Sequence, residues 1–127
     1  MQKCETLLIG EPDCKLAEEL DPWVAEKSYK VIAVDNIKDL FLALQDEKIH
    51  VLVLDLSLPE KMGHEAISII KSMYRNLPII VTTDENNPEL ESRVRQMGIF
   101  YYHVKSFGMD ELMLAIASAM AHSSRTA

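Results

Sequence analysis

The stretch that decides the fold is Val51-Leu52-Val53-Leu54-Asp55-Leu56-Ser57-Leu58-Pro59, an apolar run followed by a carboxylate. The first four residues are all apolar, as expected of a central parallel strand with helices on both of its faces. Asp55 then stands at the carboxyl end of that strand, where open parallel sheets bind their ligands. An acid in this place is either part of a site or an N-cap for the following helix.

Four other short apolar runs predict strands of the same kind, and helical periodicity fills each gap between them. The five predicted strands are Thr6–Ile9, Val31–Val34, Val51–Leu54, Ile79–Val81 and Phe100–Val104. In the gaps, apolar residues recur at spacings that place them on one face of a helix. The clearest sets are Ile37, Leu40, Phe41 and Leu44, and then Ala66, Ile69, Ile70 and Met73.

Local signals mark two helix ends and one irregularity. Asn87-Pro88 is typical of a helix start, because an N-cap residue is followed by proline at the first helical position. Gly98 is typical of a helix end. In the first helical segment Pro22 removes one backbone hydrogen bond, so we predict a kink or a break near residues 20–22.

Strands that alternate with helices predict a parallel sheet with right-handed crossovers and helices on both faces. Five strands in 127 residues predict an α/β fold of the flavodoxin-like type, a three-layer sandwich with strand order 2-1-3-4-5. In that order the ligand site lies between the carboxyl ends of strands 1 and 3. Glu11 and Asp55 follow those two strands, so the sequence predicts a site there.

The composition fits one domain and limits its partners. The net charge of −7 argues against a nucleic-acid surface and suits a cation site. The sequence shows neither an apolar span of membrane length nor a signal-peptide pattern, and Cys4 and Cys14 match neither a disulfide framework nor a metal site. We expect a cytoplasmic domain over residues 1–121, with no nucleic-acid or membrane contact, followed by a polar tail or linker start over residues 122–127.

Polar residues follow four of the five predicted strands and should meet at one edge of the sheet. They are, in chain order, Glu11 with Asp13 nearby, Asp55, then Thr82, Thr83 and Asp84, and finally Lys105. These are the parts that phosphoryl transfer to a carboxylate requires. An aspartate can form an aspartyl-phosphate, two carboxylates suit Mg²⁺, and an ammonium and a hydroxyl can hold the phosphoryl oxygens.

Three motifs in this order resemble the receiver domain of two-component response regulators, and the resemblance covers nearly the whole chain. Each motif alone is a weak signal, but the three together on the expected elements are specific. They are Asp55…Pro59…Gly63 after an apolar strand, Pro78-Ile79-Ile80-Val81-Thr82-Thr83, and Gly98-Ile99-Phe100-Tyr101-Tyr102-His103-Val104-Lys105-Ser106-Phe107.

The resemblance implies a phosphoacceptor and its metal ligands. Asp55 would accept a phosphoryl group from a histidine kinase or a histidine phosphotransfer protein. Glu11, Asp55 and the backbone carbonyl of Ser57 would bind Mg²⁺, with Asp13 as a further candidate ligand. No enzymatic activity beyond this transfer is expected.

The resemblance also implies a switch. Thr83 and Lys105 would bind the phosphoryl group, and Tyr102 would turn inward as Thr83 moves. An aromatic residue on a strand can equally be plain core packing. The output surface would be the fourth helix, the fifth strand and the fifth helix, which is predicted over Asp110–Ala121. That surface would contact an output domain, a downstream protein or a second copy of the chain.

Three positions depart from the family pattern. The family has two adjacent acids after the first strand, whereas here Gly10 precedes Glu11, so we hypothesise reduced Mg²⁺ affinity and slower phosphorylation. Ser106 replaces the usual proline, and because a cis bond before a non-proline residue costs roughly 2.5–4 kcal/mol, we predict a trans bond after Lys105. Asp84 adds negative charge where relatives carry a small residue, and it either points outward or hinders phosphate.

These departures leave open a degenerate receiver that binds proteins without phosphorylation. A flavin site is disfavoured because residues 10–13 are not a loop rich in Gly, Ser and Thr. A haloacid-type phosphatase is disfavoured because Ser57 occupies the position of its second aspartate. The histidines lack the mutual spacing of a metal or catalytic site, which favours structural or surface roles for His50, His64, His103 and His122.

Overall fold

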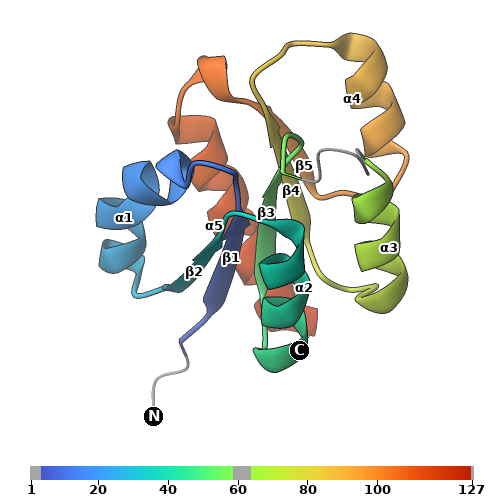
Figure 1. Ribbon diagram of the computed structural model, residues 1–127. Coiled ribbons are helices and arrows are strands. Elements are labelled where there is room, and N and C mark those ends of the chain that lie inside the picture. The colour runs from blue at the N-terminus through green and yellow to red at the C-terminus, as the bar shows by residue number, and fades with distance from the viewer. Residues whose placement is uncertain (1–3, 59–63, 127) are drawn as a thin grey trace.

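The computed structural model describes residues 4–58 and 64–126, which form five strands and five helices in alternation (Figure 1). The strands are β1 Thr6–Gly10, β2 Lys30–Val34, β3 Val51–Asp55, β4 Ile79–Thr83 and β5 Tyr101–Val104. The helices are α1 Lys15–Lys27, α2 Ile37–Asp46, α3 Glu65–Met73, α4 Pro88–Arg95 and α5 Asp110–Thr126, with a 3₁₀ turn at Lys105–Phe107. Pro59 and Gly63 of the first motif lie outside the described residues.

The strands form one parallel sheet in the order β2-β1-β3-β4-β5. This confirms the predicted flavodoxin-like α/β fold. Helices α1 and α5 cover one face of the sheet, and α2, α3 and α4 cover the other (Figure 1). Every residue of β1, β3 and β4 is buried, because these three strands have neighbours on both edges and helices on both faces.

The two faces of the sheet have separate cores. On the α2–α4 side, Leu40 and Ile67 pack against alternate strand residues such as Leu52. On the α1–α5 side, Leu20 and Ile116 pack against the residues in between, among them Val53 and Ile80. The alternation decides which face each site residue joins, because successive strand residues point to opposite sides.

Helix α1 runs without interruption through Pro22, so the predicted break is wrong. Buried side chains of α1, Leu16, Leu20 and Val24, hold it on the sheet on both sides of the proline. Their burial outweighs the loss of one backbone hydrogen bond. The other predicted outcome, a kink in α1 near residues 20–22, stays a prediction.

The ends of α4 and α5 test two further predictions. Asn87 caps α4 by accepting a hydrogen bond from the Leu90 amide at 3.1 Å, which confirms the predicted start. Helix α4 ends at Arg95, and Gly98, at φ 82°, closes the turn that follows. Helix α5 continues to Thr126, beyond its predicted end and into the polar segment. None of the described helices is long and apolar enough to cross a membrane.

We predict that Leu52→Ala lowers the free energy of unfolding by about 2–5 kcal/mol, because Leu52 is fully buried in the central strand and its loss leaves a cavity. Leu114→Ala is the matched control, since Leu114 is 70% exposed on α5 and should change stability by less than about 0.5 kcal/mol. Urea unfolding followed by circular dichroism measures both values. Equal losses in the two variants would contradict the core assignment.

Candidate functional site

Asp55 is the last residue of β3 and is buried, with 2% of its surface exposed. It pairs in register with Thr82 of β4, so the two residues lie side by side on adjacent strands. Since Asp55 follows Val51 and Val53 in the strand alternation, it belongs to the α1–α5 side of the sheet. The strand, and not a helix cap, determines its position.

Both carboxylate oxygens of Asp55 accept hydrogen bonds. Oδ1 lies 2.8 Å from the Thr82 hydroxyl and 2.9 Å from the Lys105 ammonium. Oδ2 accepts the Ser57 amide at 3.1 Å and also the Ser57 hydroxyl. Burial alone would raise the pKa of Asp55, but the bonds from Ser57, Lys105 and Thr82 outweigh burial and hold that pKa below its usual value. Asp55 is therefore a buried anion at neutral pH.

The Lys105 ammonium joins Asp55 to Glu11 and is about a quarter exposed. Glu11 is buried just after β1, and its second oxygen accepts the Leu16 amide of α1 at 2.6 Å. Burial would lower the pKa of Lys105, but Glu11 and Asp55 raise it well above its ordinary value. The three charged groups thus form one ion cluster across β1, β3 and the end of β5.

Thr83 and Tyr102 lie on the other side of the sheet from this cluster. The Thr83 hydroxyl accepts the Glu85 amide at 3.3 Å instead of contacting Asp55. Tyr102 is buried in the α2–α4 core, where its hydroxyl interacts with the Thr83 side chain. Burial raises the pKa of Tyr102. The structure therefore places the two predicted switch residues on one face of the sheet and Asp55 on the other.

Two predicted acids stand at the margin of the cluster. Asp13 is more than half exposed and is directed to Lys15, whose ammonium lies 4.0 Å away. Asp84 is 79% exposed and lies 3.9 Å from the Lys105 ammonium. An exposed pair at that separation contributes little energy. Asp84 is therefore an exposed acid at the rim of the cluster, and its effect on phosphate stays a prediction.

A cavity of about 430 Å³ opens beside the cluster. Its lining residues come from α1, β5 and the loops after β1, β4 and β5; they are Glu11, Asp13, Lys15, Leu16, Glu19, Asp84, His103, Lys105, Ser106 and Met109. Glu11 and Lys105 reach this cavity from the ion cluster. Asp55 itself does not line the cavity, which meets the cluster at Glu11 and Lys105.

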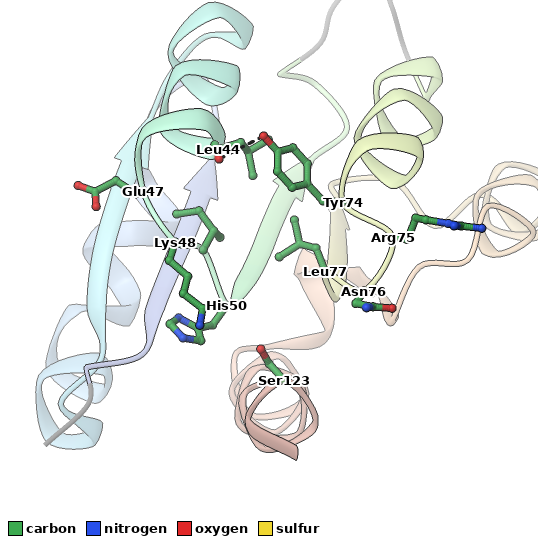
Figure 2. Close-up of a pocket in the computed structure, with 10 residues that line it drawn as sticks. Leu44, Glu47, Lys48, His50, Tyr74, Arg75, Asn76, Leu77 and Ser123 are labelled. Carbon is green, nitrogen blue, oxygen red and sulfur yellow. Dashed lines mark hydrogen bonds between the residues drawn. The ribbon is translucent and has the colours of Figure 1, made fainter. Parts of the chain in front are cut away.

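A second cavity, of about 410 Å³, lies at the amino ends of the strands, away from Asp55 (Figure 2). His50 and Leu77, which line it, come just before β3 and β4, so the cavity is at the amino ends of these strands. Its polar groups serve the fold: His50 Nδ1 accepts the Thr6 amide at 2.9 Å, and the Tyr74 hydroxyl donates to the Leu44 carbonyl at 3.2 Å. It takes no part in the site at Asp55.

Two carboxylates of the site, those of Glu11 and Asp55, are suitable ligands for Mg²⁺. Here Glu11 and Asp55 converge on the Lys105 ammonium and so share one position for positive charge. Mg²⁺ commonly takes one or two carboxylates and keeps several waters. Among the described residues no three Asp, Glu, His or Cys side chains are arranged to hold a metal, and Asp13 stands apart.

The glycine at the first acidic position of the family is closely covered. A Cβ atom built on Gly10 would lie 2.7 Å from Cδ2 of Leu58 and 3.4 Å from Leu40. Leu58 is buried and packs in the α2–α4 core. Any side chain at position 10 would have to displace the end of Leu58, on the α2–α4 side of the sheet.

The bond that follows Lys105 agrees with prediction. The described residues contain no cis peptide bond, so the Lys105–Ser106 bond is trans. A 3₁₀ turn over Lys105–Phe107 leads into Gly108 at φ 97°, and the Gly108 amide bonds the Lys105 carbonyl at 3.2 Å. This turn carries the chain from β5 to α5 directly above the site.

The fold and this edge-of-sheet cluster define an α/β domain of the receiver type, and comparison with known proteins places it in a family. The family model for the response regulator receiver domain matches residues 7–117. The chain therefore belongs to the response regulator receiver domain family.

Relatives that have names support this family assignment. The chain is 28% identical over 122 residues to the DNA-binding transcriptional regulator NtrC of Proteus hauseri and 32% identical over 110 residues to the transcriptional regulatory protein KdpE of Staphylococcus aureus. The alignments cover 96% and 87% of this chain but 26% and 47% of those proteins, so the chain spans less than half the length of either.

Solved structures show the same fold. RcsB from Salmonella enterica matches with a TM-score of 0.79 and 26% identity over 89% of this chain and 66% of that chain. The receiver domain of an HD domain-containing protein from Pseudomonas fluorescens matches with a TM-score of 0.85 and 18% identity, over 97% of this chain and 99% of that chain.

Sequence reasoning missed the parts played by Thr82 and His103. Thr82 was grouped with the residues after the fourth strand, but β4 continues to Thr83 and pairs Thr82 with Asp55. Aligning the carboxyl ends of strands 3 and 4 could have found this pair. His103 is 1% exposed on β5 and lines the cavity beside the cluster, and its ring interacts with the Gly108 backbone.

We predict that His103 makes the domain sensitive to acid. Burial lowers the pKa of His103, and the Gly108 backbone and Glu111 offset this only in part. Below about pH 6.5 the unfolded chain therefore binds a proton that the folded chain does not, and stability falls with pH by up to about 1.4 kcal/mol per pH unit. Urea unfolding at pH 7.5 and pH 5.5 should show a smaller loss for His103→Leu than for the unsubstituted protein.

The half-buried His64 supplies the control for this test. His64→Gln should keep the full pH dependence of the unsubstituted protein, because His64 lies in the turn before α3, outside the cavity lined by His103. A pH dependence that His103→Leu leaves unchanged would contradict the assignment.

Proposed function

We propose that this domain accepts a phosphoryl group on Asp55 from a phosphohistidine of a histidine kinase or a histidine phosphotransfer protein. The observation that carries the proposal is the ion cluster, in which Lys105 lies between two buried carboxylates at the end of β3. An anionic carboxylate beside an ammonium can act as nucleophile and can have the incoming charge neutralised at the same point.

The covalent step exchanges one bond to phosphorus for another. A carboxylate oxygen of Asp55 attacks the phosphorus, the new O–P bond forms as the P–N bond to imidazole breaks, and the leaving nitrogen keeps the bonding electron pair. With acetyl phosphate as donor, the bond broken is P–O and acetate leaves. The low pKa of Asp55 keeps its oxygens deprotonated for this attack.

Mg²⁺, when bound by Glu11, Asp55 and the backbone carbonyl of Ser57, would neutralise charge on the phosphoryl oxygens. Lys105 would transfer part of its ion pairing from Asp55 to the phosphoryl group. The partly exposed side chain of Lys105 and the cavity beside it support this movement.

The signal would pass through Thr83 and Tyr102. The Thr83 hydroxyl, which accepts the Glu85 amide at 3.3 Å, could turn to a phosphoryl oxygen. Thr83 and Tyr102 share the α2–α4 face, which links such a movement to α4 and β5. This surface would contact an output domain, a downstream protein or a second copy of the chain, in the cytoplasm and without direct contact to nucleic acid or membrane.

A second candidate function is a degenerate receiver that binds a partner without phosphate. The packing of Leu58 over Gly10, where the family has an acid, specifically favours it. The absence of that acid weakens cation binding, on which transfer in the family depends. Phosphorylation with a defined donor separates the two functions.

We predict that acetyl phosphate with Mg²⁺ adds one phosphoryl group to the protein, seen by intact mass spectrometry. Asp55→Asn should show no gain, because the amide lacks the nucleophilic carboxylate while keeping its shape. Omitting Mg²⁺ should reduce the gain. No gain in the unsubstituted protein at high donor and Mg²⁺ concentrations would contradict the proposal and support the degenerate receiver.

A further inference from the structure

The hydrogen bonds to Asp55 already fill its acceptor positions. An ionised carboxylate has about four such positions, two on each oxygen. Thr82 and Lys105 donate to Oδ1, and the amide and hydroxyl of Ser57 donate to Oδ2. A cation can therefore reach Asp55 only by displacing one of these donors.

Glu11 and Asp55 contact the same cation, the Lys105 ammonium, and Asp55 does so through its Oδ1 atom. Lys105 contacts Oδ1 of Asp55 at 2.9 Å and bonds Glu11 at the same time. Glu11 and Asp55 would hold a divalent cation, which would compete with the donors that already contact Oδ1. The Thr82 hydroxyl, 2.8 Å from this same oxygen, holds its other lone pair.

The two groups that donate to Oδ1 of Asp55, the Lys105 ammonium and the Thr82 hydroxyl, differ in how easily they can move away from it. Lys105 reaches the site on a long side chain that is about a quarter exposed. Thr82 is fully buried within β4, has a short β-branched side chain, and is held beside Asp55 by the strand register. The ammonium can move aside for a cation, whereas the threonine hydroxyl stays.

We propose that Thr82 is a positioning residue that holds Oδ1 of Asp55 and thereby weakens the binding of divalent cations at this site. The inference rests on the proposed function, since it concerns the metal site of the phosphoacceptor. It concerns a different residue from Thr83, whose hydroxyl lies on the other face of the sheet. It adds a second cause of low Mg²⁺ affinity to the absence of an acid at Gly10.

Thr82→Val tests the inference because it removes the hydroxyl and nearly keeps the shape. Thermal unfolding of the full chain is measured in EDTA and in increasing MgCl₂. We expect Thr82→Val to unfold about 5 °C lower in EDTA, since a buried anion loses a donor. We expect its midpoint to rise more with Mg²⁺ than that of the unsubstituted protein, with an apparent Kd about three- to tenfold lower.

Two further variants distinguish an effect at Asp55 from a general packing effect. Thr82→Ser keeps the hydroxyl and should restore the Mg²⁺ response of the unsubstituted protein. Thr6→Val makes the same substitution at a buried position at the amino end of β1, far from Asp55, and should leave the Mg²⁺ response unchanged.

A Mg²⁺ affinity of Thr82→Val that is equal to or lower than that of the unsubstituted protein would overturn the inference. So would a response of Thr82→Ser that matches Thr82→Val. Neither measurement uses a phosphodonor, so failure here is distinct from failure of Asp55 to accept a phosphoryl group.

Discussion

The ion pairing of Lys105 with Glu11 and Asp55 is the interaction on which the rest of the site depends. Two buried carboxylates close together repel each other and have lost most of their hydration, which is unfavourable without a compensating charge. The Lys105 ammonium supplies that charge, and the Leu16, Ser57 and Thr82 donors satisfy the remaining oxygens. Removing the lysine would leave two uncompensated buried anions.

The strand order explains how such a cluster can form. Glu11 and Asp55 follow β1 and β3, which are neighbours in the sheet, so the two acids meet at the switch point. Lys105 follows β5, and β4 lies between β5 and β3. Only a long side chain can span that distance, and Thr82 of the intervening strand lies close enough to bond the same carboxylate oxygen.

Because side chains alternate along each strand, the ion cluster at Asp55 and the proposed switch residues lie on opposite faces of the sheet. Asp55, Thr82 and His103 belong to the side covered by α1 and α5, whereas Thr83 and Tyr102 belong to the side covered by α2, α3 and α4. Thr83 follows Thr82, the strand partner of Asp55, and belongs to the far face, so a change at Asp55 would reach that face at the end of β4. This gives a physical reason why the last residue of β4 would act as the relay in the proposed function.

Much of this arrangement could be predicted from the sequence, because hydrophobic periodicity and strand order decide it. The apolar run before Asp55 and the helical stripes between runs led to the correct sheet and the correct edge. Thr82 escaped prediction because it depends on where β4 ends, and strand ends are set by pairing rather than by local pattern. His103 escaped because its burial depends on how the turn at Lys105–Phe107 and helix α5 pack over it.

The central claim is that the Lys105 cluster is the resting state of a phosphoacceptor. The most direct measurement is ¹⁵N-resolved NMR of the full chain, with beryllium fluoride and Mg²⁺ added as a phosphoryl mimic. The account predicts amide shift changes at Asp55, Thr83 and Lys105 that extend to Tyr102 and α4, and none in Asp55→Asn. An unchanged spectrum, or one that changes equally in Asp55→Asn, would contradict it.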